Sequence, residues 1–384
     1  MAKKKISHRS TNNKRFSHRS TKNIEILVLT CFFLSGLTGL IYEVLWTRMI
    51  VKIIGSAPFA VSIILTIFMG GLGLGSYLAS RTIDRIKEPI RLVRIYGILE
   101  LAIGAYGLVI PVLLMAFKPL FAILYNQLFS HFMLYNLLTF VGCSILFCIP
   151  VICMGATLPI LCRFYVTKLS HLGTHTGRLY GLNTIGAALG ALLCGFWLID
   201  FLGVGGSLVV AVLVNGIIGL SCLIVRCKAV TQKVATNQPA CDSQKSLQTV
   251  GAEGTASAEH QWAVNGALVI FAVSGFCAMA YEVIWTKLLG LIIGPTTYSF
   301  TIVLVTFILG LALGSMIFGW LADKSSKTIW LLIFTQIAAA FFVLATSQLL
   351  GNSQLFFAKV IFNFKEQFTA LSVSKAVILF IFMI

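Results

Sequence analysis

The feature that most constrains this chain is a series of long apolar stretches, each near the length that crosses a lipid bilayer. A helix needs about 20 mostly apolar residues to span the hydrocarbon core. Charged residues make up 11% of the 384 residues, whereas a soluble domain has about a quarter. We therefore predict an all-α polytopic membrane protein with about 9–10 transmembrane helices in a lipid bilayer. The predicted spans lie near 26–50, 58–80, 95–117, 134–158, 181–203, 206–226, 263–290, 297–320 and 328–350, and a tenth begins near Ala376.

A second feature is an internal repeat at a constant offset of 239 residues (274 − 35). The segment SGLTGLIYEVLWTRMIVKIIG, which begins at Ser35, recurs as SGFCAMAYEVIWTKLLGLIIG from Ser274. Further along, FMGGLGLGS recurs as FILGLALGS at the same offset. An ungapped match of this length is not expected by chance, so we predict an internal duplication.

The repeat organises the predicted domains. Six spans (24–226) precede a polar segment, 227–261, which has no apolar periodicity and is predicted to be a cytosolic linker. An even number of spans lets the second copy, 262–384, enter the membrane in the same direction as the first. The prediction is therefore a parallel pair of six-helix halves, as in transporters of the major facilitator (MFS) type. The second half is incomplete, because 373–384 matches only the opening of the fourth span, and we expect a longer polypeptide.

Basic residues predict the orientation. Residues 1–23 carry eight Lys and Arg and no acid. We predict a disordered cytosolic tail there, with binding to anionic lipid headgroups as the alternative. Nucleic acid is not an expected partner, because no nucleic-acid-binding fold accompanies the charge. A cytoplasmic N-terminus places 22 of the 29 Lys and Arg on the cytoplasmic side, as the positive-inside rule requires.

Four motifs together resemble one protein family. They are GLIYEVLWTR (39–48), FMGGLGLGS (68–76), CMGATLPIL (153–161) and GRLYGLNTIGAALGALLCGFWLI (177–199). Their order resembles the membrane-embedded part of bacterial fused MFS-like/spermidine synthase proteins, over residues 25–350. The resemblance implies a multi-pass protein of the bacterial cytoplasmic (inner) membrane.

The resemblance also implies a partner. Family members usually carry a soluble aminopropyltransferase domain after the membrane part, which binds decarboxylated S-adenosylmethionine beside a Gly-rich loop. The Gly cluster GVGG at 203–206 instead falls in a tight turn between two predicted spans. We therefore expect no catalysis and no cofactor in this chain alone, and an aminopropyltransferase domain or subunit as a partner.

Repeated polar residues inside the spans are the candidate functional site. Ionisable groups in a membrane are costly and by default mark a functional site. Glu43 shares a helical face with Trp46 and Thr47 at spacings of three and four residues. A carboxylate beside an aromatic ring suits a cation, and the resemblance makes polyamines the natural candidate. The candidate substrate or ion pathway comprises Tyr42, Glu43, Trp46, Thr47, Glu100, Tyr281, Glu282, Trp285 and Thr286.

A structural interpretation of the same residues remains open. Glu43 is five residues from Arg48 and nine from Lys52, and Glu282 is five from Lys287, so each acid has a candidate charge partner near the outer interface. Trp46 and Trp285 are then interfacial belt residues. Glu100 has no copy in the second half, and structural and proton-relay roles are both open for it.

The glycines have a simpler explanation. Small residues spaced GxxxG let helix backbones approach closely in lipid. We predict helix packing at Gly71, Gly75, Gly186 and Gly190, and at the copies Gly310 and Gly314. The ten cysteines include no CxxC pair, and no metal site is predicted.

Three functions remain open at this point. The first, which we favour, is the membrane module of a spermidine synthase-like protein. The second is a secondary transporter of a cationic or amine substrate, which would require Glu43 or Glu282, whereas an anchor would tolerate glutamine at both positions. The third is a non-functional remnant.

Overall fold

The structure is a computed structural model in which every regular element is a helix. It describes residues 2–55, 57–86, 88–165, 172–224, 256–293, 297–325 and 328–352. The helices are α1 (Ala2–Ile54), α2 (Ala57–Ile83), α3 (Pro89–Leu128), α4 (Phe132–Tyr165), α5 (Leu172–Leu193), the π-helical η2 (Cys194–Leu198), α6 (Ile199–Ile224), α9 (Ala256–Ile293), α10 (Thr297–Lys324) and α11 (Thr328–Asn352).

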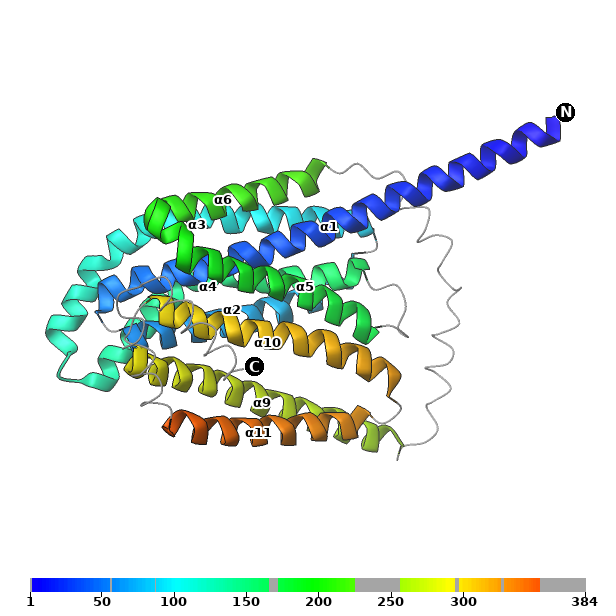
Figure 1. Cartoon of the computed structure of the whole chain (residues 1–384). Coiled ribbons are helices and arrows are strands. Elements are labelled where there is room, and N and C mark those ends of the chain that lie inside the picture. Colours follow the sequence, from blue (N-terminus) through cyan, green and yellow to red (C-terminus); the bar gives the residue numbers. More distant parts are fainter. Residues whose placement is uncertain are drawn as a thin grey trace, which may run out of the picture.

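Eight helical segments among the described residues are long and apolar enough to cross a membrane. The prediction of an all-helical polytopic membrane protein is therefore confirmed. The longest segment, Thr176–Ile224, has 49 residues, about 74 Å at 1.5 Å per residue and far more than one bilayer needs. It is broken at Gly203, whose φ of 67° and ψ of −179° are not helical. Figure 1 shows α5 and α6 running in opposite directions on either side of this predicted turn.

The helix ends recur at the offset of the sequence repeat. Helix α9 ends at Ile293, which is 239 residues after the end of α1 at Ile54 (293 − 54). Helix α11 begins at Thr328, which is 239 residues after the start of α3 at Pro89 (328 − 89). The ends of α10 lie 240 and 241 residues after those of α2 (297 − 57 and 324 − 83), so these helix boundaries of the two copies agree to within two residues.

The first six helices pack around α1. Helix α1 packs against α5 and α6, α2 packs against α4, and α3 packs against both α4 and α6. Helix α10 joins this group through an extensive contact with α5. Its residues Leu304, Val305 and Ile308 belong to the same buried core as residues of α1, α2 and α4. The core thus includes one helix from the second copy.

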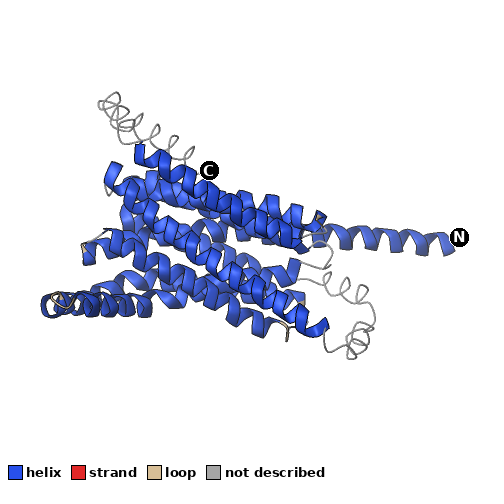
Figure 2. Ribbon diagram, turned by 90° about the horizontal axis from the view of Figure 1, so that it is seen from below, coloured by secondary structure: helices blue, strands red, loops and turns tan. Residues whose placement is uncertain are grey.

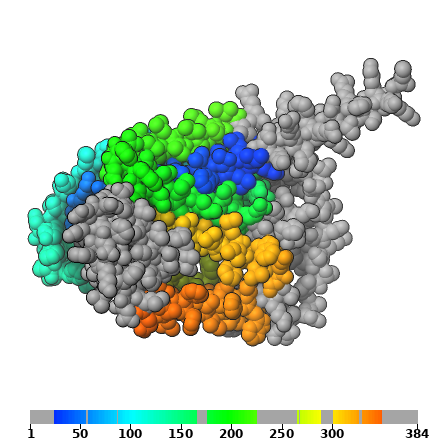
Figure 3. Space-filling view, in the orientation of Figure 1, coloured from blue at the N-terminus to red at the C-terminus, as the bar shows by residue number. Residues whose placement is uncertain are grey.

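Helices α9 and α11 lie at the periphery. Only 6% of the most apolar window of each is buried, against 50% for α2. Large apolar side chains such as Phe271, Phe276 and Phe341 are strongly exposed on them. Figure 3 shows α11 along one edge of the molecule. Exposed apolar surface of this kind suits lipid, which is the environment that the helix lengths also indicate.

Basic side chains gather at one end of the bundle. Successive helices alternate in direction (Figure 1), so the start of α1 lies at the same end as Arg81, Arg91, Arg163 and Lys324. The opposite end carries Lys52, where α1 finishes.

Two predicted domain boundaries differ from the structure. Helix α1 begins at Ala2, so residues 2–23 extend the first span as a helix rather than form a disordered tail (Figure 2). That stretch contains no Gly or Pro to end a helix. Helix α9 begins at Ala256, so the last residues of the predicted linker are helical as well. The rest of the linker and the predicted tenth span lie outside the described residues.

Candidate functional site

The repeated acidic residue is buried inside the bundle in both copies. Glu43 of α1 is 2% exposed and Glu282 of α9 is 3% exposed. A charge on Glu282 acts on Glu43 through space, although the helices that carry them, α1 and α9, make no extensive contact with each other. The repeated YEV sequence therefore places one buried acidic residue on a helix of each copy.

Neither carboxyl has the charge partner that the sequence suggested. The Oε1 atom of Glu43 and the Oε2 atom of Glu282 are buried without a hydrogen-bond partner. Among the described residues, the salt bridge that forms joins Glu88 to Arg91 on the exposed surface. In the part of the chain that the structure describes, the candidate pairs of Glu43 with Arg48 and of Glu282 with Lys287 do not form salt bridges.

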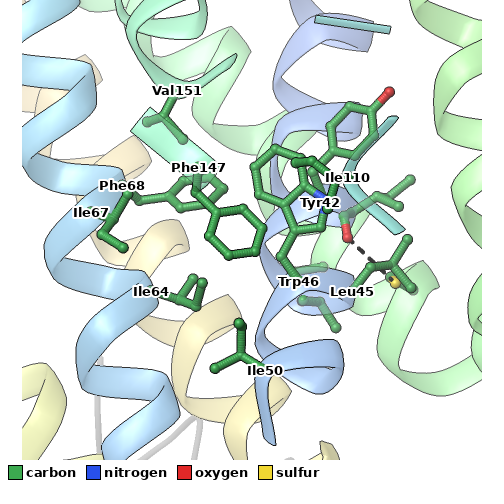
Figure 4. Close-up of a cluster of buried hydrophobic side chains, with 14 of the residues drawn as sticks. Tyr42, Leu45, Trp46, Ile50, Ile64, Ile67, Phe68, Ile110, Phe147 and Val151 are labelled. Atoms are coloured by element: carbon green, nitrogen blue, oxygen red, sulfur yellow. Dashed lines mark hydrogen bonds between the residues drawn. The ribbon is translucent and has the colours of Figure 1, made fainter. Parts of the chain in front are cut away.

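Tyr42 and Trp46 lie in the core of the first copy. Both are fully buried. The Trp46 ring packs against Tyr42 at a centroid distance of 5.2 Å, against Phe147 at 5.2 Å and against Phe68 at 5.6 Å (Figure 4). Its neighbours are therefore other aromatic rings from α1, α2 and α4. This corrects the expectation that Trp46 belongs to an interfacial belt, since such a belt residue would reach the headgroup region.

The hydroxyl of Tyr42 faces a different helix. A side chain at Gly107 of α3 would meet the Tyr42 ring and its hydroxyl oxygen, so the glycine makes room for the tyrosine. That hydroxyl has no hydrogen-bond partner. On α9, Tyr281 and Trp285 are only partly buried.

The two threonines make the same local hydrogen bond in both copies. Thr47 Oγ1 donates to the backbone oxygen of Glu43 at 2.7 Å, and Thr286 Oγ1 donates to that of Glu282 at 2.8 Å. This bond to the carbonyl four residues earlier is common for threonine in helices. The hydroxyl hydrogens are thus used within each helix rather than offered to the carboxyl groups.

Glu100 forms a separate polar cluster inside the first copy. Its side chain is fully buried on α3. Ser35 Oγ of α1 donates to Glu100 Oε1 at 2.5 Å, and Asn215 Nδ2 of α6 donates to Glu100 Oε2 at 3.2 Å. We name Ser35, Tyr96, Glu100 and Asn215 the Glu100 cluster. The sequence analysis missed Ser35 and Asn215 as site residues, although each is a polar residue inside an apolar span, which is the signal that would have found them.

The small residues pack as predicted in the first copy. A side chain at Gly71 would meet Val151, and one at Gly75 would meet the backbone of Ile152 in α4. Side chains at Gly186 and Gly190 of α5 would meet the backbone oxygens of Phe33 and Leu37 in α1. For Gly310 and Gly314 of α10, in contrast, no described residue lies within 4 Å, so the expected packing is not seen there.

A cavity of about 320 Å³ opens at the end of the bundle where α1 and α9 finish. Lys287 lines it together with aromatic side chains of α2, α3 and α4. The cavity is mostly apolar, and its one basic side chain disfavours a cation there. Among the described residues, no three His, Cys, Asp or Glu side chains lie together in a way that could hold a metal ion.

Comparisons of the chain with protein-family models, with curated proteins and with solved structures found no match. The geometry of the site therefore has to carry the functional argument. The firm conclusion at this stage is that the chain is a multi-pass helical membrane protein with two buried acidic sites.

Proposed function

We propose that this chain is a membrane module that binds a cationic amine between Glu43 and Glu282. The observation that carries the proposal is a buried carboxyl group in each copy, with an oxygen atom that has no hydrogen-bond partner. No described basic side chain forms a salt bridge with either one.

A positive charge at this site would lower the electrostatic energy of the two buried carboxyl groups. A buried carboxylate without a partner is costly, and two close to each other also repel. Either protonation of the carboxyl groups or a cation between them removes this unfavourable energy. An ammonium group suits the site because it carries one positive charge, and because its three hydrogen-bond donors can bind the carboxyl oxygens that have no partner.

The choice of an amine rests on the resemblance. The four motifs resemble the membrane part of spermidine synthase-like proteins, whose products are polyamines. We propose accordingly that the chain is the membrane module of such a protein, and that an aminopropyltransferase domain or subunit is its partner. A secondary transporter of amines uses the same site and differs only in releasing the amine on the other side.

The proposed architecture is two parallel MFS-like halves in the bacterial inner membrane, with the N-terminus in the cytoplasm. The recurring helix ends support the duplication. An axis along the membrane normal between parallel copies would bring Glu43 and Glu282 together, as the proposal requires. The basic residues at the end where α1 begins support the orientation.

The test is binding of radiolabelled spermidine to the purified protein in lipid nanodiscs. The variants are Glu43→Gln, Glu282→Gln and the double variant. Glu88→Gln is the matched control, because Glu88 is exposed and paired with Arg91. We expect each single variant at the site to weaken binding by about tenfold, or about 1.4 kcal/mol, and the control to bind as the wild type does.

The outcomes separate the open functions. Equal affinity of the wild type and the double variant would refute the site. Absence of spermidine binding to the wild type would refute the amine. If binding is confirmed, uptake into proteoliposomes distinguishes transport from a module that only holds the amine for a partner enzyme. A module that serves purely as an anchor tolerates glutamine at both positions.

A further inference from the structure

The Glu100 cluster lies where α1, α3 and α6 meet, and it belongs to the first copy alone. Glu100 has no acidic counterpart in the second copy, since residue 339 is Ala. Its carboxyl group is fully buried and accepts hydrogen bonds from Ser35 and Asn215. The cluster is therefore a polar site distinct from the pair Glu43 and Glu282.

The cluster holds buried polar atoms with unused capacity. Asn215 is 1% exposed and its Oδ1 atom has no hydrogen-bond partner. Tyr96, one helical turn before Glu100 on α3, is fully buried and its hydroxyl has no partner. A buried polar atom without a hydrogen bond is destabilising, and each one in a native structure asks for an explanation.

No basic side chain in the described part of the chain forms a salt bridge with Glu100. The titratable side chains that interact electrostatically with Glu100 are Cys31 and Tyr42 from α1, Tyr96 from α3 and Cys222 from α6. None of them is basic. An ionised Glu100 would be a lone buried charge in the membrane, which is strongly unfavourable.

We propose that Glu100 is an exchangeable proton-binding site. A larger cation fits poorly, because Ser35 Oγ and Glu100 Oε1 are 2.5 Å apart and leave no space between them. The same geometry serves both protonation states. The Ser35 hydroxyl donates to the ionised carboxylate, and after protonation Oε1–H donates to Ser35 Oγ while the serine hydrogen rotates away.

The unused atoms give the proton further places to bind. Asn215 presents an amide whose oxygen and nitrogen are nearly isosteric, so a rotation of the amide places Oδ1 to accept a hydrogen from Glu100 Oε2. The hydroxyl of Tyr96 adds a donor on the same helix. Protonation therefore adds one donor to a cluster that holds a buried acceptor without a partner.

The test is infrared spectroscopy of the full chain in lipid bilayers over a pH titration. A protonated carboxylic acid has a carbonyl stretching band that the carboxylate lacks. We expect the wild type to show a band that disappears as pH rises, and Glu100→Gln to lack it. Glu88→Gln is the matched control and keeps the band, because Glu88 is exposed.

Further variants keep the result decisive. Ser35→Ala shifts the frequency of the band, since it removes one hydrogen bond, and so assigns the band even if Glu100→Gln does not fold. The Glu43→Gln/Glu282→Gln double variant retains this band, so the inference stands or falls separately from the amine site.

Two results would overturn the proposal. If the wild type and Glu100→Gln have identical carboxylic acid bands at every pH, Glu100 is ionised throughout. If the band assigned to Glu100 persists to the highest pH at which the protein stays folded, the group is a permanently neutral packing residue and exchanges no proton.

Discussion

Helices α2 and α10 carry the same pattern of small residues and use it differently. On α2, Gly71 and Gly75 lie directly against α4. On α10, the equivalent Gly310 and Gly314 have no described residue within 4 Å, and the helix packs instead on α5. The comparison shows that glycine spacing marks a helix surface that another helix can pack against. Which helix packs there depends on the tertiary arrangement.

Helices α1 and α9 differ in the same way. The most apolar window of α1 is 39% buried and that of α9 is 6% buried. Trp46 is enclosed by three aromatic rings, whereas Trp285 is partly exposed. Among the side chains described on both of these helices, the glutamate is the one that is buried in α1 and in α9. Burial that persists when the surroundings change is the strongest reason to assign Glu43 and Glu282 to a common site.

The largest expected difference between the copies is at the tryptophans. Trp46→Ala removes a fully buried side chain and its aromatic contacts, which typically costs about 3–5 kcal/mol. Trp285→Ala leaves less of a cavity and is expected to cost clearly less. Thermal unfolding of both variants in one detergent measures the difference, and equal losses would show that α9 is packed as tightly as α1.

The glycines of α2 and α10 provide the next comparison. Gly75→Leu places a side chain against the backbone of Ile152, which cannot move aside as a flexible side chain could. We therefore expect the free energy of unfolding to fall by about 1–3 kcal/mol or more. Gly314→Leu meets no described residue and should change stability by less than about 0.5 kcal/mol. The unfolding midpoints of the two variants test this. An equal loss would indicate that the face of α10 is covered.

Helix α5 allows a comparison within one element. Gly186→Ala meets the backbone oxygen of Phe33 in α1, whereas Gly181→Ala meets Cγ and Sδ of the Met316 side chain in α10. We expect Gly186→Ala to cost about 1–2 kcal/mol. For Gly181→Ala, the gain in helix propensity of about 1 kcal/mol offsets the shift of Met316. A larger loss for Gly181→Ala in thermal unfolding would show that the α5–α10 contact is the more rigid one.

The threonines should show the smallest effect and no difference between copies. Thr47→Val and Thr286→Val each remove a side-chain hydrogen bond to a carbonyl within the same helix. The net value of such a bond is about 0.5–1.5 kcal/mol, and the carbonyl keeps its helical partner, so we expect the low end. Spermidine binding should also be unchanged. Weaker binding by Thr47→Val alone would place its hydroxyl in the site after all.

Much of the fold could be predicted from local sequence. Apolar length located the spans, and the turn at Gly203 was expected from the GVGG cluster, because a positive φ favours glycine. The repeat predicted the recurring helix ends. Helical spacing did not show that the Trp46 side chain is buried in the core of the first copy. Spacings of three and four residues show which side chains share a face of the helix, but not whether lipid or another helix contacts that face.

The candidate site was predicted only in part. Glu43 and Glu282 stood out because acids are rare in membrane spans. Ser35 and Asn215 did not, because their role depends on contacts across 65 and 115 residues of chain with Glu100. A polar residue inside an apolar span is visible in the sequence, but the residue that it contacts is not.

The sequence by itself determined the class of this protein: apolar length and a low content of charge require helices in a bilayer, and the repeat makes the same helices form twice. Only the tertiary structure decided which of the repeated residues meet. Lipid is as apolar as the side chains, so burial gives no direction to helix association there. Close packing at small residues and a few polar contacts choose the partners. These choices bury Glu43 and Glu282, bring Ser35 and Asn215 to Glu100, and leave Gly310 and Gly314 without a described neighbour.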